Sequence, residues 1–201
     1  MELFLNPSRP TPHTGLAPSP WVVRWSHLVA PGATVLDVAC GAGRHVRWFA
    51  QRGCRVTALD RDAAAVEPLH AIAEVVLADI EAGAWPLAGR RFDAVIVTNY
   101  LWRALVPTLI ASLADGGVLL WETFASGNQT VGRPSNPQFL LEPGELLEAA
   151  AGLHVVAYEN GFLERPDRFV QRICAVRARR PQPLRAALSA QVKSVDSEEP
   201  P

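Results

Sequence analysis

The stretch that most constrains the fold is VLDVACGAGRH at residues 35–45. The apolar run from Thr34 to Ala39 predicts a buried strand, and residues 44–52 carry a helical pattern. Gly41 and Gly43 stand between them. A strand, a glycine turn and a helix in this order form a nucleotide-binding corner, because glycine lets a ligand approach the backbone and the helix N-terminus offers free N–H groups.

Composition excludes several broad classes for the 201-residue chain. A formal net charge of −1 argues against a wide basic surface that binds nucleic acid. The chain has no run of 18 apolar, uncharged residues, so no membrane span is predicted. The proline-rich N-terminus does not resemble a secretory signal. Cys40, Cys54 and Cys174 are scattered and odd in number, which is typical of reduced thiols, so we expect a cytoplasmic protein.

Strand and helix patterns alternate along most of the chain. Strands are predicted at 34–39, 55–59, 74–78, 92–97, 118–123, 154–158 and 169–176, and helices at 21–29, 44–52, 63–70, 101–113 and 145–151. Ser19 and Pro20 are expected to start the first helix, Asp62 to cap the third, and Pro107 to kink the fourth. Gly53 and Gly152 are expected to end helices, and residues 115–117 to form a turn.

This alternation predicts an α/β fold with a doubly wound, mostly parallel sheet, into which the late strand pair brings one antiparallel strand. We expect an extended N-terminal arm at residues 1–20, one domain at 21–178 and a disordered tail at 179–201 that includes Arg179 and Arg180. The loop at 125–143 is too long for a bare connector, which indicates a functional loop.

Ligands of open α/β sheets bind beyond the carboxyl ends of the strands. Asp60 follows the second strand at a spacing suited to accepting hydrogen bonds from two ribose hydroxyls. Asp79 and Ile80 follow the third strand, where a carboxylate or nearby backbone and an apolar side chain could hold adenine. Together these residues predict a nucleoside site.

The acid inside the corner decides between cofactors. Asp37 would repel the diphosphate of a dinucleotide, and Val46 replaces the third glycine of the dinucleotide pattern. S-adenosylmethionine carries a sulfonium, an ammonium and a carboxylate instead, and its cations suit an acid. The corner therefore favours S-adenosylmethionine over NAD.

Residues 37–45 and 56–60 resemble the first two motifs of class I S-adenosylmethionine-dependent methyltransferases. Residues 92–100 are similar to the fourth motif of that family, and 115–120 resemble the turn into its fifth strand. Within the class, residues 43–45, 122–128, 132–134 and 139–146 look most like the tellurite-resistance and thiopurine-type small-molecule methyltransferases.

The resemblance spans roughly residues 33–178 and implies a Rossmann-like, seven-stranded sheet with the last strand antiparallel, and S-adenosylmethionine as cofactor. It leaves the acceptor open. The residues expected to contact the cofactor are Asp37, Ala39, Cys40, Gly41, Gly43, Arg44, Asp60, Arg61, Asp79, Ile80 and Asn99.

Several of these residues keep an alternative interpretation. Asp37 could instead order the glycine loop, and Asp79 could cap a turn. Arg44 could face solvent or pair with Asp37 or a cofactor carboxylate. Cys40 is expected to be a small buried side chain, and His45 a packed or surface histidine rather than a base.

Two residues are candidates for catalysis by substrate positioning. Tyr100 follows the fourth strand, where its ring could face the sulfonium, and its alternative is an aromatic at the rim. Glu122 lies in an apolar strand end, where an unpaired acid is costly, so we expect a partner that is either substrate or an arginine.

Around the expected acceptor, residues for the substrate loop are Arg103, Asn128, Arg133, Asn136 and Phe139, and their alternative is a plain surface loop. Trp21, Arg24 and Trp25 could form a helix that closes over the cofactor or simply packs. No metal site is predicted.

The function predicted is methyl transfer from S-adenosylmethionine to a small-molecule acceptor by in-line displacement. One alternative is an RNA or protein methyltransferase, which the near-neutral charge and the lack of an Asn-Pro-Pro-Tyr signature at 99–102 make less favourable. A second is a non-catalytic S-adenosylmethionine-binding protein, and a third is an NAD-dependent enzyme. The sequence does not predict an oligomeric state.

Overall fold

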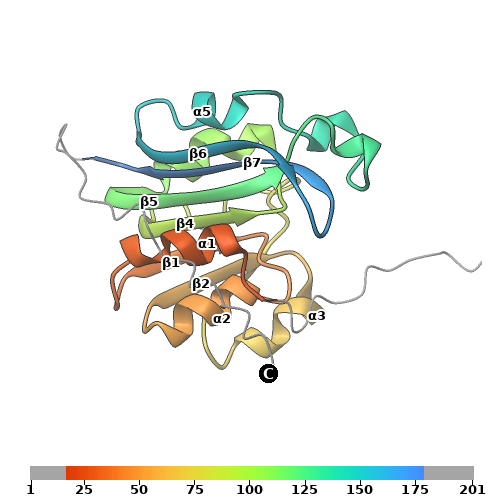
Figure 1. The fold of residues 1–201 in the computed structure, drawn as a ribbon. Helices are drawn as coiled ribbons and strands as arrows, with labels where there is room; N and C mark the ends of the chain where they lie inside the picture. The colour runs from red at the N-terminus through yellow and green to blue at the C-terminus, as the bar shows by residue number, and fades with distance from the viewer. Residues whose placement is uncertain (1–16, 179–201) are drawn as a thin grey trace, which may run out of the picture.

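The computed structural model describes residues 17–178 (Figure 1). The predicted tail at 179–201 and most of the predicted arm at 1–20 lie outside the described residues.

The core of the fold is a seven-stranded sheet of order β3-β2-β1-β4-β5-β7-β6 (Figure 1). Its strands are β1 (Thr34–Val38), β2 (Arg55–Asp60), β3 (Glu74–Leu77), β4 (Phe92–Thr98), β5 (Leu113–Phe124), β6 (His154–Leu163) and β7 (Arg168–Val176). Strands β1 to β5 pair in parallel, whereas β7 is antiparallel to both β5 and β6. The predicted sheet with an antiparallel last strand is confirmed.

Chain order reverses at β1, which pairs with β2 on one side and β4 on the other. A crevice at such a switch point is where open α/β sheets bind ligands. The loops that follow β1, β2, β3 and β4 converge there.

The described helical segments are α1 (Pro20–Trp25), η1 (Ser26–Leu28), α2 (Arg44–Gln51), α3 (Ala63–Val66), η2 (Glu67–Leu69), η3 (Arg103–Leu105), α4 (Val106–Ala111), η4 (Asn128–Thr130), η5 (Pro137–Phe139) and α5 (Glu145–Ala149). The buried residues of α1, α2 and α3 share one apolar cluster, and those of α4 and α5 share another. Neighbouring β1 residues divide between the clusters, Val35 in the first and Leu36 in the second, so the sheet is covered on both faces.

Helix α1 begins as its sequence predicts. Pro20 occupies the first position, and the Ser19 hydroxyl accepts a hydrogen bond from the Trp21 N–H at 3.1 Å. The Trp21 and Trp25 rings meet edge to face with centroids 5.8 Å apart, both fully buried. The Trp21 indole N–H donates to the Ile173 carbonyl at 3.2 Å, which fastens α1 to β7.

The predicted kink at Pro107 is wrong, because α4 begins at Val106 and Pro107 lies in its first turn. A first-turn N–H has no partner within the helix, so proline costs little there. The predicted turn at 115–117 lies inside β5. Phe92 pairs with Leu113 but Ala94 with Val118, so the intervening β5 residues bulge from the ladder.

The loop at 125–143 contains η4 and η5, and its ends meet in a bridge between Ala125 and Leu141. In the described part of the chain, no helix is both long and apolar enough to cross a membrane.

Candidate active site

Three adjoining cavities lie at the carboxyl ends of the central strands. The acidic cavity, of about 220 Å³, is lined by Ala39, Asp60, Arg61, Ala78, Asp79, Ile80, Glu81 and Tyr100. The glycine cavity, also about 220 Å³, is lined by Ala39, Cys40, Gly41, Ala42, Gly43, Arg44, Thr98 and Asn99. The loop cavity, about 230 Å³, is lined by Glu81, Asn99, Tyr100, Leu101, Thr123, Phe124, Pro134 and Phe139.

Shared residues connect the three cavities. Ala39 lines both the acidic and the glycine cavity. Asn99 joins the loop cavity to the glycine cavity, and Glu81 and Tyr100 join it to the acidic cavity. The structure therefore brings together ten of the eleven residues predicted to contact a cofactor. Asp37 is buried and lines none of the three cavities, but it is close enough to Arg44 and Cys40 of the glycine cavity to interact with them electrostatically.

The glycine corner requires glycine at Gly43, whose φ is +75°. A Cβ there would lie 2.5 Å from a Leu69 methyl, which is well inside contact distance. Gly41 and Ala39 also have positive φ values, +53° and +52°. After this tight turn, helix α2 begins at Arg44. The backbone N–H groups in the first turn of α2 have no partners within the helix and are free to bind a ligand in the cavity.

Asp60 joins the end of β2 to the glycine corner. One carboxylate oxygen accepts the Gly41 N–H at 2.7 Å and the other accepts the Asp62 N–H at 2.9 Å. The carboxylate also lines the acidic cavity, so its remaining lone pairs could meet a ligand hydroxyl.

Asp79 caps a turn, the alternative that its position allowed. Its Oδ1 accepts N–H bonds from Glu81 at 3.0 Å and Ala82 at 3.3 Å, and its Oδ2 lies 3.6 Å from Arg61. These hydrogen bonds, of which the one from the Glu81 N–H has the largest effect, hold the pKa of Asp79 below its usual value. Arg61 is largely exposed at this rim.

Asp37 is fully buried, and neither of its carboxylate oxygens has a hydrogen-bond partner among the described residues. Burial raises its pKa to about 7, while the nearby Arg44 charge opposes the rise. The Val46 N–H lies near enough to favour the charged form slightly, yet its geometry falls short of a hydrogen bond. An unpaired buried acid is costly, so Asp37 is a candidate for charge compensation by a ligand.

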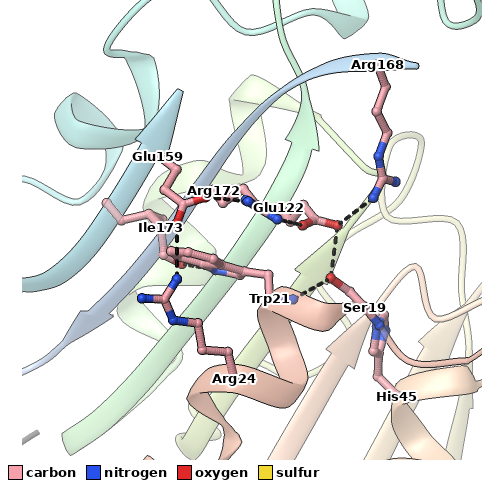
Figure 2. Close-up of polar contacts among 9 residues, drawn as sticks. All are labelled: Ser19, Trp21, Arg24, His45, Glu122, Glu159, Arg168, Arg172 and Ile173. Carbon is pink, nitrogen blue, oxygen red and sulfur yellow. Dashed lines mark hydrogen bonds and ion pairs between the residues drawn. The ribbon is translucent and has the colours of Figure 1, made fainter. Parts of the chain in front are cut away.

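Glu122 is buried under α1 and held by protein groups (Figure 2). Its Oε1 accepts the Ser19 hydroxyl at 3.0 Å, and its Oε2 lies 3.4 Å from the Arg172 guanidinium. Arg168 lies 3.9 Å from Oε1. The expected arginine partner is therefore present. Since both oxygens are engaged, this arrangement argues against the predicted role of Glu122 in positioning substrate.

The same network continues to the surface. Arg172 also pairs with Glu159, which in turn lies 3.2 Å from Arg24 (Figure 2). The Arg172 guanidinium stacks over the Trp21 ring at 5.1 Å. Ion pairs and a cation–π contact thus join helix α1 to β5, β6 and β7, in addition to apolar packing. These contacts support the interpretation that Trp21 and Trp25 pack against the sheet.

His45 is a packed histidine. Its Nε2 accepts the Ser19 N–H at 3.0 Å, so we assign the ring hydrogen to Nδ1, which faces the Thr98 hydroxyl at 3.4 Å. Burial, aided by the Arg44 charge, lowers its pKa to about 3. A ring that is neutral and already accepts a hydrogen bond is not available as a base.

Arg103 and Asn128 were predicted to face substrate, but the structure uses both to brace the loop. The Arg103 guanidinium binds both Glu145 oxygens, at 2.7 and 3.0 Å, and the carbonyls of Gln138 and Leu140. Asn128 is buried, donating to the Pro134 carbonyl at 3.0 Å and accepting the Phe169 N–H at 3.2 Å. Their hydrogen-bonding groups serve the loop itself.

The remaining loop residues divide between surface and cavity. Arg133 is exposed, and Asn136 is exposed and caps η5 by accepting the Gln138 N–H at 3.0 Å. Phe139 is 44% exposed and lines the loop cavity. Only Phe139 of the five predicted loop residues therefore reaches a described cavity wall.

Tyr100 stands between the acidic and loop cavities, and its buried hydroxyl has no hydrogen-bond partner among the described residues. Burial and the nearby Glu81 carboxylate raise its pKa well above the usual range, so the hydroxyl stays protonated, although Glu81 falls short of hydrogen-bond geometry. Burial, aided by Asp37, likewise raises the pKa of the Cys40 thiol, which is therefore no nucleophile.

Sequence reasoning missed Ser19, Arg168 and Arg172 as partners of Glu122, and Glu81 as a cavity residue. Arg172 faces Glu122 only because β7 pairs with β5 in antiparallel register, which the sequence does not fix. Glu81 carried a signal, since it follows Asp79 and Ile80 directly. Within the described chain, no group of three or more acidic, histidine or cysteine side chains is arranged to hold a metal ion.

Residues 35–117 match the family model of a methyltransferase domain. This segment of the chain is similar to a methyltransferase domain. That segment covers β1 to the β5 bulge, and therefore the walls of the acidic and glycine cavities.

Among curated relatives, the malonyl-[acyl-carrier protein] O-methyltransferase of Enterobacter lignolyticus is 39% identical over 102 residues. The match covers 47% of this chain and 40% of that enzyme, so the chain spans less than half the length of this relative.

Solved structures share the fold of this chain. TehB from Haemophilus influenzae superposes with a TM-score of 0.63 at 22% identity, covering 77% of this chain and 60% of TehB. The 1,6-didemethyltoxoflavin-N1-methyltransferase of Burkholderia thailandensis gives 0.56 at 20% identity, covering 79% and 76%. These likenesses confirm a Rossmann-like methyltransferase fold.

Proposed function

We propose that the protein transfers a methyl group from S-adenosylmethionine to a small-molecule acceptor. The observation that carries the proposal is the buried, unpaired Asp37 close to a glycine cavity that adjoins an acidic cavity. A ligand that is cationic at one end and a nucleoside at the other matches both cavities. The methyltransferase domain match supports the same ligand.

The residues present fit the two ends of this cofactor. Asp60 would accept the ribose hydroxyls, and Asp79 with Ile80 would border the adenine. In the glycine cavity, the first N–H groups of α2 and the Arg44 guanidinium suit a carboxylate, while Asp37 balances the ammonium charge. A dinucleotide would place its diphosphate beside Asp37, so NAD fits less well.

When bound, S-adenosylmethionine supplies a methyl group already activated by its sulfonium. The task of the chain is then to align the acceptor and exclude water. Asn99 and Tyr100 border the junction of all three cavities and would orient the acceptor. Burial raises the pKa values of the Tyr100 hydroxyl and the Cys40 thiol, so both keep their protons and neither serves as a base.

Two alternatives compete with this proposal. The curated relative acts on a malonyl group linked to an acyl-carrier protein, so an acceptor of that kind is one alternative. A protein that binds the cofactor without turnover is the other, and single-turnover transfer of a labelled methyl group would separate it from an enzyme. Cytoplasmic location and the absence of nucleic-acid binding stay predictions.

Isothermal calorimetry tests the cofactor. S-adenosylmethionine should bind in the micromolar range, and Asp60→Ala should weaken binding at least about ten-fold, because a charge-assisted hydrogen bond is lost. Asp93→Ala is the matched control, since Asp93 bonds to Thr34 at the opposite, amino-terminal end of β4. Equal affinities of both variants would count against the proposed site.

A further inference from the structure

The loop cavity is a third compartment whose occupant the family does not define. It shares Glu81 and Tyr100 with the acidic cavity and Asn99 with the glycine cavity, so it borders the point where the two ends of a bound cofactor would meet. A molecule in it would face the cofactor from the side of the loop at 125–143. The cavity is therefore placed to hold a methyl acceptor, if the proposed function holds.

Most of its wall is apolar. The apolar and aromatic lining residues are Tyr100, Leu101, Phe124, Pro134 and Phe139. Phe139 is 44% exposed although it is a large aromatic side chain, and it stands on a loop clamped by Arg103. Such a wall favours a flat or apolar acceptor of modest size, because a ligand there would cover the exposed ring.

The charge of the wall is acidic. Glu81 is the single charged residue that lines the cavity, and no arginine, lysine or histidine does so among the described residues. Arg61 lies against Asp79 and Arg103 against Glu145, while Arg133, the residue before Pro134, is exposed and does not line the cavity. A carboxylate, phosphate or thiolate acceptor would meet an unbalanced negative charge. A neutral or protonated nitrogen group would find an acceptor for its hydrogen bonds.

Base chemistry narrows the acceptor further. The Tyr100 hydroxyl and Cys40 thiol keep their protons, and His45 is already hydrogen-bonded to Ser19 through its Nε2. An alcohol needs proton removal before it attacks well, whereas an uncharged amine brings its own lone pair. Nitrogen is thus the nucleophile that this cavity accommodates without a strong base.

We propose that the methyl acceptor is a small apolar or aromatic amine held in the loop cavity, with the Glu81 carboxylate accepting an N–H hydrogen bond from the reacting nitrogen. This inference rests on the proposed methyltransferase function. The nitrogen lone pair forms the new N–C bond as the C–S bond breaks, and the bonding electrons stay on sulfur as a neutral thioether. The positive charge passes to nitrogen, which then releases one proton to water.

The test uses the full chain with S-adenosylmethionine that carries a deuterated methyl group. A cell metabolite extract is separated by ion exchange beforehand into cationic, anionic and uncharged fractions, and each is incubated with the protein. Mass spectrometry should find deuterated products methylated on nitrogen, from the cationic fraction or, for a weakly basic aromatic amine, from the uncharged fraction. Products from the anionic fraction alone, or a methyl group found on oxygen or sulfur, would overturn the amine inference while leaving the methyltransferase function intact.

Failure of the proposed function gives a different result. If calorimetry detects no S-adenosylmethionine binding, or if no fraction yields product, the transferase proposal falls and the amine inference falls with it. If S-adenosylmethionine binds but its methyl group passes only to acids, the transferase proposal stands and the amine inference is wrong. The two failures are therefore distinguishable.

Glu81→Gln tests the residue itself. It should lower kcat/KM for the amine that the extract identifies at least about ten-fold, since a charge-assisted bond becomes a neutral one. Calorimetry without cofactor should show weaker binding of the same amine. Glu164→Gln is the matched control, because Glu164 is exposed in the turn between β6 and β7 and lines none of the three cavities. Equal amine affinity and kcat/KM in both variants would contradict the role of Glu81.

Discussion

The buried acid behind the glycine corner should make the protein less stable as pH rises. Burial lifts the pKa of Asp37 from 3.8 in a solvated chain to about 7 in the folded protein. Between these values the folded state holds a proton that the unfolded state has lost, so the free energy of unfolding falls with pH. The penalty develops from about pH 4 and is complete slightly above pH 7.

Asp37→Asn isolates this effect because the amide never ionises. Each pH unit in the window costs about 1.4 kcal/mol, so the full penalty is roughly 4 kcal/mol. The buried amide also lacks partners, which makes the absolute gain in stability smaller. The change with pH is therefore the diagnostic quantity: from pH 5 to pH 8 the variant should gain roughly 2–3 kcal/mol relative to the parent.

Urea denaturation of the cofactor-free protein at pH 5, 6, 7 and 8 measures both proteins under identical conditions. Subtracting one free energy of unfolding from the other cancels groups that titrate alike in both. The difference should grow up to about pH 7 and then level off. A difference that stays flat or shrinks across this range would refute the account of Asp37 as an unpaired buried acid.

Three further changes test other parts of the structure. Glu122→Gln should lower the free energy of unfolding by about 2–4 kcal/mol in urea denaturation, because it leaves Arg172 without its buried carboxylate partner. Glu159→Gln, at the half-exposed end of the same network, should cost less than about 1 kcal/mol. Equal losses would contradict the buried network. Gly43→Ala should lower Tm clearly more than Gly32→Ala, since both have positive φ but only the first would also strike a leucine methyl; similar shifts would argue against that contact. Arg103→Met should speed proteolysis within 125–143 without a comparable change in global unfolding, and an unchanged cleavage rate would show that the loop does not depend on this clamp.

The sequence predicts the architecture well because strong local signals agree with the topology. Gly41 and Gly43 occupy positive-φ positions of the expected corner, and Ser19 and Asp62 cap the expected helices. The apolar run at 92–97 becomes a central strand paired on both sides, as continuous apolar runs do in parallel sheets.

Side-chain roles were predicted less well where long-range pairing decides them. The partners of Glu122 come from β7 and from the residue before α1, both remote in sequence. Arg103 was expected near substrate, yet it meets Glu145 across the folded loop. Pro107 illustrates a local error, because a proline signals either a kink or a helix start and the sequence pattern alone chose the wrong one.

Calorimetric titration of the cofactor-free protein with S-adenosylmethionine, and separately with NADH, tests the central claim most directly. The account predicts micromolar binding of S-adenosylmethionine, at least about ten-fold weaker binding by Asp60→Ala, and no measurable heat with NADH. Binding of NADH without binding of S-adenosylmethionine would contradict the assignment of the glycine and acidic cavities to a methyl donor.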